Sequence, residues 1–269
     1  MQLRRLGNTG IDVSPIGLGT VKIGRNQGVK YPHEFELPED DVVRGLLAAA
    51  RDLGVNLIDT APAYGTSEER LGPLLAAERD AWIIVSKVGE EFEAGVSSFN
   101  FSPEHTRSSV ERSLQRLRTD RLDCVLVHSD GNDETIIDSM GTLQALADLK
   151  TRGLIRSFGM STKTIAGSRQ AMPTCDVLML TYNQREPEMG PIIVEAAAAG
   201  VGVLIKKGFA SGHLTEKTVP DTVSRCDEPV AAALRFIFAR PGVSSVITGT
   251  LSPVHLQQNV DAAERAIRD

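Results

Sequence analysis

The segment Asp123-Cys124-Val125-Leu126-Val127 shows the pattern that decides the fold of this 269-residue chain. It is a short run of mainly apolar and β-branched side chains, and such a run predicts a strand. Seven similar runs are spread along the sequence: Ile16–Leu18, Val55–Ile58, Trp82–Val85, Ile155–Gly159, Val177–Leu180, Val201–Ile205 and Ser244–Ile247. The sequence therefore predicts eight short strands.

Amphipathic stretches with helix start signals separate these runs. An acidic residue or a proline in a first helical turn suits the backbone N–H groups there, which have no partner inside the helix. Such signals stand at Pro38–Asp41, Ser67–Glu69, Ser102–Glu104, Asp133–Thr135, Glu186–Glu188, Asp227–Pro229 and Ser252–Pro253. Strand and helix alternate without a break in composition, which indicates parallel strands joined by right-handed crossovers and closed on themselves. We predict an α/β fold, a (β/α)8 TIM barrel, with residues 1–269 forming one domain.

An open, doubly wound sheet is the competing architecture, and the glycine-rich segment Gly17–Lys22 is the feature that would favour it. A dinucleotide-binding fingerprint needs a third glycine, and Lys22 stands where that glycine would be. The substitution favours the closed barrel over the open sheet.

Three connecting segments shape the two ends of the predicted barrel. Residues 2–14 contain Gly7-Asn8-Thr9-Gly10 between two alternating segments, which predicts an N-terminal β-hairpin closing the bottom of the barrel. Residues 22–37 and 89–102 form long connections that each follow a strand. Because such loops gather at the catalytic face of a barrel, we expect both to overhang it.

The composition of the chain indicates where the protein is located and which partners are excluded. No stretch approaches the ~18 apolar residues of a membrane helix and the N-terminus is polar, so we expect a cytoplasmic protein with no membrane partner. The net charge of −6 comes from acids and bases mixed along the chain, which argues against a nucleic acid partner. Cys124, Cys175 and Cys226 lack the short spacing of a zinc or redox motif, so we expect reduced thiols.

Four polar residues stand where predicted strands end, and strand ends build the active site of a barrel. Asp59, Lys87 and His128 each end an apolar run, and Tyr64 follows Asp59 by five residues. A carboxylate and an ammonium at the top of a packed core are costly unless they pair, so we expect Asp59 to pair with Lys87. Taken singly, the pair could be a plain salt bridge, Tyr64 a packed ring and His128 a core histidine; their arrival at one rim favours catalysis.

A phenol with a pKa near 10 is a poor acid at neutral pH. A neighbouring ammonium favours the phenolate, so we expect Lys87 to lower the pKa of Tyr64 toward working pH.

The chain resembles the aldo-keto reductase superfamily in a series of segments that occur in family order. These are Arg5–Gly10, Ile16–Thr20, Ile58–Gly65, Ser86–Val88, Leu122–His128, Gly159–Ser161, Tyr182–Asn183 and Leu256–Asn259. The resemblance implies a catalytic tetrad of Asp59, Tyr64, Lys87 and His128. It further implies hydride transfer from NADPH to the carbonyl of a small substrate without a metal, with Tyr64 donating the proton and His128 orienting the carbonyl.

The same resemblance implies where the cofactor binds. Expected contacts are Thr20 and Val21; Ser161 and Thr162; Lys206, Lys207, Gly208, Phe209, Ser211, Gly212 and Leu214; and Gly249, Thr250, Ser252, His255, Gln258 and Asn259. The last group lies at the start of the final predicted helix, where backbone N–H groups suit a phosphate.

Several positions depart from the family pattern. Thr162 replaces the usual asparagine, Met179 the usual glutamine and Lys206 an aromatic residue. His255 stands where an arginine commonly grips the 2′-phosphate, and a neutral histidine is a weaker partner, so NADH use is also possible.

Two other functions remain open at this point. The altered cofactor anchors would suit a cofactor-sensing or partner-binding module with little turnover. A lysine-dependent lyase using Lys87 as a Schiff-base nucleophile is the other, although a paired ammonium is a poor nucleophile. The sequence leaves the substrate, the direction of reaction and the choice between a monomer and a small homo-oligomer undecided.

Overall fold

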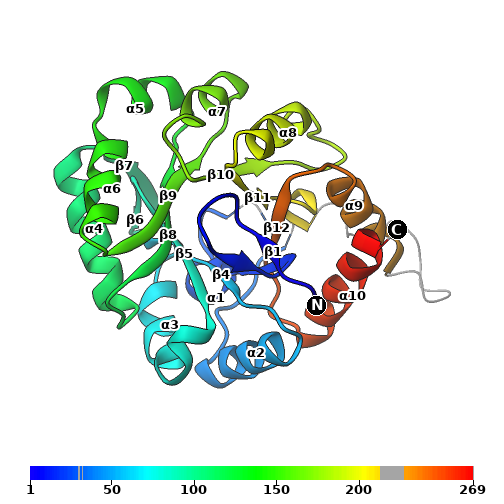
Figure 1. The fold of residues 1–269 in the computed structure, drawn as a ribbon. Helices are drawn as coiled ribbons and strands as arrows, with labels where there is room; N and C mark the ends of the chain where they lie inside the picture. Colours follow the sequence, from blue (N-terminus) through cyan, green and yellow to red (C-terminus); the bar gives the residue numbers. More distant parts are fainter. Residues whose placement is uncertain (30, 32, 213–226, 269) are drawn as a thin grey trace.

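Eight parallel strands close into a barrel at the centre of the molecule. The computed structural model describes residues 1–29, 31, 33–212 and 227–268. In sequence order the barrel strands are β3 (Ile16–Gly19), β4 (Leu57–Asp59), β5 (Ile83–Val88), β8 (Leu122–His128), β9 (Ile155–Ser161), β10 (Val177–Thr181), β11 (Gly202–Lys206) and β12 (Val243–Thr248). Strand β12 pairs with β3 and completes the ring (Figure 1). The predicted (β/α)8 barrel is confirmed.

Helices surround the barrel on its outside (Figure 1). They are α1 (Val21–Gly24), α2 (Asp40–Asp52), α3 (Ser67–Leu75), α4 (Pro103–Arg116), α5 (Asp133–Ser139), α6 (Thr142–Thr151), α7 (Ile165–Ala171), α8 (Gly190–Ala198), α9 (Asp227–Phe238) and α10 (Pro253–Arg268). Helix α4 shows how the start signals act: Ser102 accepts a hydrogen bond from the His105 backbone N–H, and Pro103 fills the first helical position. No helix in the described ranges is long and apolar enough to cross a bilayer.

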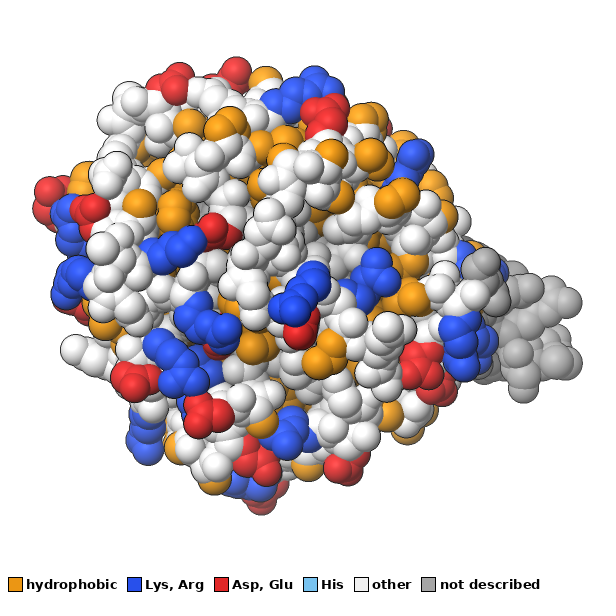
Figure 2. Space-filling view, in the orientation of Figure 1, with side chains coloured by type: hydrophobic (Ala, Val, Ile, Leu, Met, Phe, Trp, Pro, Cys, Tyr) orange, Lys and Arg blue, Asp and Glu red, His pale blue; other side chains and the backbone are white. Residues whose placement is uncertain are grey.

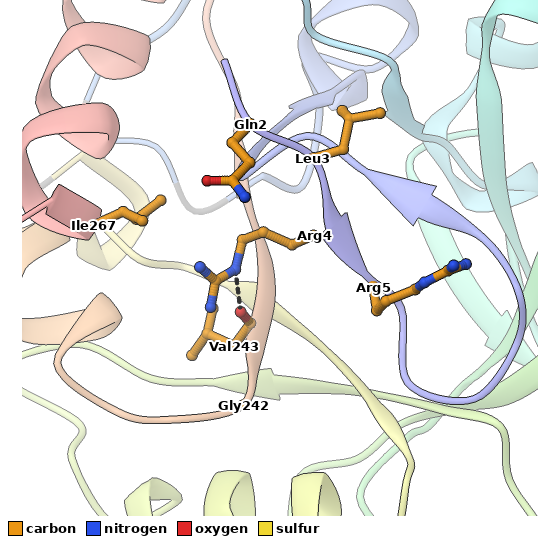
Figure 3. A pocket seen from close by; sticks show the side chains of 7 residues that line it. All are labelled: Gln2, Leu3, Arg4, Arg5, Gly242, Val243 and Ile267. Atoms are coloured by element: carbon orange, nitrogen blue, oxygen red, sulfur yellow. Dashed lines mark hydrogen bonds between the residues drawn. The ribbon is translucent and has the colours of Figure 1, made fainter.

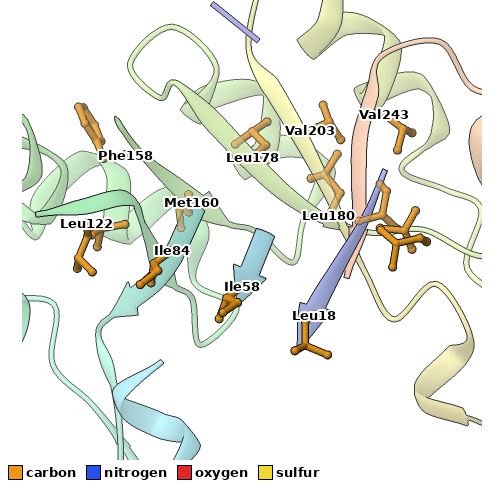
Figure 4. Close-up of a cluster of buried hydrophobic side chains, with 14 of the residues drawn as sticks. Leu18, Ile58, Ile84, Leu122, Phe158, Met160, Leu178, Leu180, Val203 and Val243 are labelled. Carbon is orange, nitrogen blue, oxygen red and sulfur yellow. The ribbon is translucent and has the colours of Figure 1, made fainter. Parts of the chain in front are cut away.

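The alternation of side chains along each strand divides the core into two layers. Outward residues such as Ile58, Ile84 and Leu178 pack against the helices (Figure 4). Their neighbours Leu57 and Val85 point to the barrel interior and form a second cluster there. Residues two positions apart on a strand therefore share one layer.

The N-terminal hairpin closes one end of the barrel, as the sequence predicted. Strands β1 (Arg4–Arg5) and β2 (Asp12–Val13) pair antiparallel, and Leu6 packs into the interior cluster. Gly7 has a φ of +55° and lies so near the start of β11 that an added Cβ would come within 2.3 Å of the Gly202 nitrogen. The turn thus needs glycine both for its backbone conformation and for space.

Some boundaries and one element differ from the sequence prediction. Asn56, expected in a strand, instead uses its side-chain amide to bind the backbone of Ser14 and Asp12 below the barrel. The connection 89–102 folds into an antiparallel hairpin, β6 (Glu90–Glu93) and β7 (Val96–Phe99), which the sequence did not reveal. The first difference arises because the Asn56 side chain bonds neighbouring backbone, and the second because the connection 89–102 pairs with itself.

Substituting Gly159 tests the close packing of β9 against β10. An added Cβ would lie 1.7 Å from the Val177 carbonyl oxygen, so Gly159→Ala should force two paired strands apart and destabilise the fold by about 3 kcal/mol or more. Urea unfolding measures the change. Gly45→Ala is the matched control: this exposed glycine of α2 has open space around it, and the variant should gain up to about 1 kcal/mol. Equal effects of the two substitutions would contradict the packing argument.

Candidate active site

Strand alternation directs three of the four predicted catalytic side chains into the mouth of the barrel. Asp59, Lys87 and His128 each lie two residues beyond an interior core residue on their strands: Leu57, Val85 and Leu126. Because parallel strands end on the same side, these side chains meet at the C-terminal face.

Asp59 and Lys87 form a buried ion pair, as predicted. Nζ of Lys87 lies 2.5 Å from Oδ1 of Asp59, and it also donates to the Thr60 carbonyl at 2.9 Å. The two residues are only 3% and 2% exposed. Since each charge is buried, each depends on the other for its solvation.

Tyr64 reaches the same carboxylate from the short 3-10 helix Pro62–Tyr64. Its hydroxyl lies 3.4 Å from Oδ2 of Asp59, while Nζ of Lys87 lies over the tyrosine ring, 4.6 Å from the ring centroid. Burial of the phenol and the Asp59 charge together raise the pKa of Tyr64 well above its ordinary value. The expectation that Lys87 lowers this pKa is wrong, because Asp59 neutralises the ammonium and itself faces the hydroxyl.

His128 is held by an acidic residue that sequence reasoning missed. Its Nδ1 lies 2.8 Å from Oε2 of Glu90, and its ring meets the Tyr64 ring edge-on with centroids 6.3 Å apart. Burial lowers the pKa of His128 and outweighs the opposing effect of Glu90. His128 is therefore mainly neutral at pH 7.

Glu90 belongs to a wider polar network over the catalytic face. Burial raises its pKa, but His128, Ser97 and Arg25 outweigh burial and bring the value to about 2. Ser97 of the β6–β7 hairpin donates to Glu90 at 2.7 Å, and Nη1 of Arg25 lies 3.6 Å away. The available signal in the sequence was the long connection 89–102, predicted to overhang this face.

Lys206 is a second lysine at the same rim. It lies two residues after the interior residue Leu204 on β11, and its Nζ donates to Ser161 Oγ at 2.8 Å and to the Thr162 carbonyl at 3.1 Å. Burial, followed by the charges of Lys207 and Lys163, lowers its pKa to about 7.

The connection 22–37 does overhang the catalytic face. Tyr31 lies so close to Gly249 that a Cβ there would be 3.1 Å from the tyrosine hydroxyl, and Nζ of Lys22 lies 4.4 Å from the Tyr31 ring centroid. Burial and the charge of Asp59 raise the pKa of Tyr31 to about 12. A second phenol therefore stands near the tetrad.

The opposite end of the molecule carries a buried ion-pair cluster, in which Asp123 pairs with Arg79 and Arg156. An open hollow there lies under the N-terminal hairpin, where Arg4 donates to the Val243 carbonyl at 2.9 Å (Figure 3). Basic and acidic side chains are interspersed over that face (Figure 2). The described residues that line this hollow include neither an acidic side chain nor a tyrosine.

Comparison with known proteins agrees with this geometry. The model of the Aldo/keto reductase family matches residues 15–224. The chain belongs to the aldo-keto reductase family. L-galactose dehydrogenase of Arabidopsis thaliana is 31% identical, covering 97% of this chain and 88% of that protein.

Solved structures extend the likeness to three dimensions. A protein of Pseudomonas aeruginosa, provisionally classed as an aldo-keto reductase, is 49% identical with a TM-score of 0.88, covering 98% of this chain and 95% of that one. Aldo-keto reductase AKR11C1 from Bacillus halodurans is 25% identical with a TM-score of 0.79, covering 100% and 95%. This aldo-keto reductase is accordingly an NAD(P)H-dependent oxidoreductase acting on carbonyl or alcohol groups.

The expected cofactor residues of this aldo-keto reductase fall into different environments. Ser161 and Lys206 are at the rim, but the hydroxyls of Thr20 and Thr162 are buried in bonds to Asp59 and Ser168. Val21 begins α1. Lys207, Gly208 and Phe209 follow β11 and lead into the 3-10 helix Ala210–Gly212, which includes Ser211 and Gly212; Leu214 lies outside the described residues.

The remaining expected contacts gather around the start of α10. Gly249 and Thr250 follow β12, and Ser252 accepts a hydrogen bond from the His255 backbone N–H at 3.3 Å. Gln258 is half-buried, and Asn259 is 6% exposed with no side-chain hydrogen bond within the described part of the chain. The Asn259 amide is available to a polar group of a nucleotide. The N–H groups of His255 and Leu256 already bond Ser252.

No cluster of three or more side chains suited to a metal ion occurs within the described ranges.

Replacing Glu90 tests its link to His128 through the pH dependence of stability. A carboxylate with a lowered pKa stabilises the fold above its ordinary pKa of about 4.5 and loses that effect as pH falls toward 2. Glu90→Gln should cost about 2 kcal/mol at pH 7, and the difference from wild type should shrink between about pH 4.5 and pH 2 in urea unfolding. Glu93→Gln, on the exposed end of the same hairpin, should change little. A pH-independent deficit for Glu90→Gln would contradict this assignment.

Proposed function

We propose that this protein is an NADPH-dependent carbonyl oxidoreductase that interconverts an aldehyde or ketone and the alcohol, with Tyr64 as general acid. The observation that carries the proposal is that Tyr64 and Lys87 meet at the Asp59 carboxylate while the ring of His128 lies edge-on to the Tyr64 ring. Three separate strands and one short helix supply these groups. A salt bridge that served stability alone would need neither the phenol nor the imidazole.

The proton step follows from the state of Tyr64. Because its pKa is raised, the phenol is fully protonated at neutral pH and holds the proton that a developing alkoxide needs. Asp59 accepts from this hydroxyl at the long distance of 3.4 Å, so a substrate oxygen can compete for the proton. His128, held at Nδ1 by Glu90, directs its other nitrogen to the substrate, and NADPH supplies the hydride.

The residues suited to the cofactor are Ser161 and Lys206 at the rim and the segment Gly249–Asn259, which runs from the end of β12 into α10. The Asn259 amide, which has no side-chain hydrogen bond among the described residues, supports a nucleotide here. We favour NADPH from the family resemblance, with NADH as the alternative because His255 offers no permanent charge.

Names of several relatives guide the choice of substrates. Besides L-galactose dehydrogenase, they include D-arabinose 1-dehydrogenase of Saccharomyces cerevisiae, 36% identical over 55% of this chain, and D-threo-aldose 1-dehydrogenase of a Pseudomonas species. We therefore propose aldoses and small aldehydes as the first panel. The proposal also keeps a cytoplasmic location and a monomer or small homo-oligomer.

Stopped-flow oxidation of bound NADPH by nitrobenzaldehyde and by the aldose panel tests the proposal directly. Oxidation of the bound NADPH at a rate equal to or faster than steady-state turnover supports a reductase. Tight nucleotide binding without oxidation by any substrate would favour the cofactor-sensing module instead.

Removing the Tyr64 hydroxyl tests the acid. Tyr64→Phe should lower the rate of NADPH oxidation by roughly 10²- to 10⁴-fold while the dissociation constant for NADPH stays within about twofold, since only the proton donor is lost. Tyr182→Phe is the matched control, because the Tyr182 hydroxyl bonds Arg240 away from the site. Retention of most of the activity in Tyr64→Phe would remove Tyr64 from the role of acid.

A charge at position 255 tests the site of the 2′-phosphate. His255 is exposed in the first turn of α10, so His255→Arg should tighten NADPH roughly tenfold and leave NADH nearly unchanged in a fluorescence titration. Gln257→Arg adds the same charge on another side of the helix and should not distinguish the two nucleotides. If His255→Arg affects both nucleotides equally, this residue does not face the 2′-phosphate.

A further inference from the structure

Lys206 differs from the two basic groups of the expected tetrad in having no acidic partner among the described residues. Lys87 is neutralised by Asp59 at 2.5 Å, and His128 faces Glu90 at 2.8 Å. Lys206 donates only to a hydroxyl and a carbonyl, and no ion pair joins it to a carboxylate in the described part of the chain. Its positive charge is therefore left uncompensated at the mouth of the barrel.

Lys206 also lies at the same end of the barrel as His128 and Tyr64. Ser161 pairs in register with His128 on the neighbouring strand, and its hydroxyl accepts from Lys206. The side chains of His128 and Lys206 therefore reach the same end of the barrel. The charges of Lys206 and Lys87 both disfavour protonation of His128. Any group that exchanges a hydride beside Tyr64 and His128 lies within the field of the Lys206 ammonium.

The groups around Lys206 bring the protonation of its amine into the neutral pH range. Lys207, Lys163 and Lys87 oppose its protonation, and Asp133 favours it. The Asp133 carboxylate is occupied elsewhere, because it accepts from Ser129 and from the backbone and hydroxyl of Thr164. Together with burial, these charges place the pKa of Lys206 at about 7.

We propose that the ammonium of Lys206 makes this site bind reduced nicotinamide in preference to oxidised nicotinamide, so that the reduced form occupies the site when both are present. This inference rests on the proposed function. The oxidised ring carries a positive charge that the reduced ring lacks, so a nearby cation repels only the oxidised form. The phosphates are the same in both forms, and their attraction to lysines cancels when the two affinities are compared.

The preference depends on pH because the charge does. Below pH 7 Lys206 is protonated and the ratio of the dissociation constants, Kd of NADP⁺ over Kd of NADPH, is high. As pH rises through the pKa of Lys206 the ammonium loses its proton, and the ratio falls. Binding of NADP⁺ should accordingly release more protons than binding of NADPH.

Calorimetric titrations of the wild-type protein with NADP⁺ and with NADPH, at about pH 6 and about pH 8.5, test the pH dependence of this ratio. We expect the ratio to fall roughly tenfold between the two pH values. Lys206→Met should have the low ratio at both pH values, and Lys206→Arg, which keeps its charge, should have the high ratio at both. Lys150→Met removes a lysine at the opposite end of the barrel and should behave as wild type.

Three results would overturn the inference. One is a wild-type ratio that does not change with pH, and another is a pH-dependent ratio that persists in Lys206→Met. Both leave the proposed function intact, since both nucleotides still bind and Tyr64 still acts. Failure of the wild-type protein to bind either nucleotide would instead overturn the proposed function and this inference together.

Discussion

The buried pair of Asp59 and Lys87 is the constraint on which the site depends. Two charges at the top of an apolar barrel core are tolerated because they lie 2.5 Å apart and Lys87 has a further acceptor in Thr60. Burial and the Asp59 charge together keep the phenol of Tyr64 protonated. The second carboxylate oxygen of Asp59 faces that hydroxyl.

This arrangement reverses the effect on the pKa of Tyr64 that its proximity to Lys87 suggests. An isolated ammonium would make a phenol more acidic, but here the ammonium is neutralised and lies over the ring. The structure without substrate therefore has a protonated phenol, a mainly neutral imidazole and an uncompensated amine at Lys206. Each of these groups can respond to a change of charge in a bound molecule, which a fully paired site could not do.

The elements over the catalytic face give the site its individual character. The β6–β7 hairpin brings Glu90 to His128, and the connection 22–37 brings Tyr31 beside Gly249 and Arg25 toward Glu90. The barrel strands supply Asp59, Lys87 and His128, and the short helix Pro62–Tyr64 supplies Tyr64. The loops supply the groups that surround these residues, as expected when binding groups are carried on loops over a rigid scaffold.

The sequence by itself determined the barrel, the hairpin that closes it and the rim positions of Asp59, Lys87 and His128, because strand alternation is local and repeats every two residues. The direction of the Tyr64 pKa, the Glu90 contact with His128 and the isolation of Lys206 were decided only by the tertiary structure. Each depends on distances between side chains from segments far apart in the chain. Burial and Coulomb energy depend on those distances, and sequence spacing does not contain them.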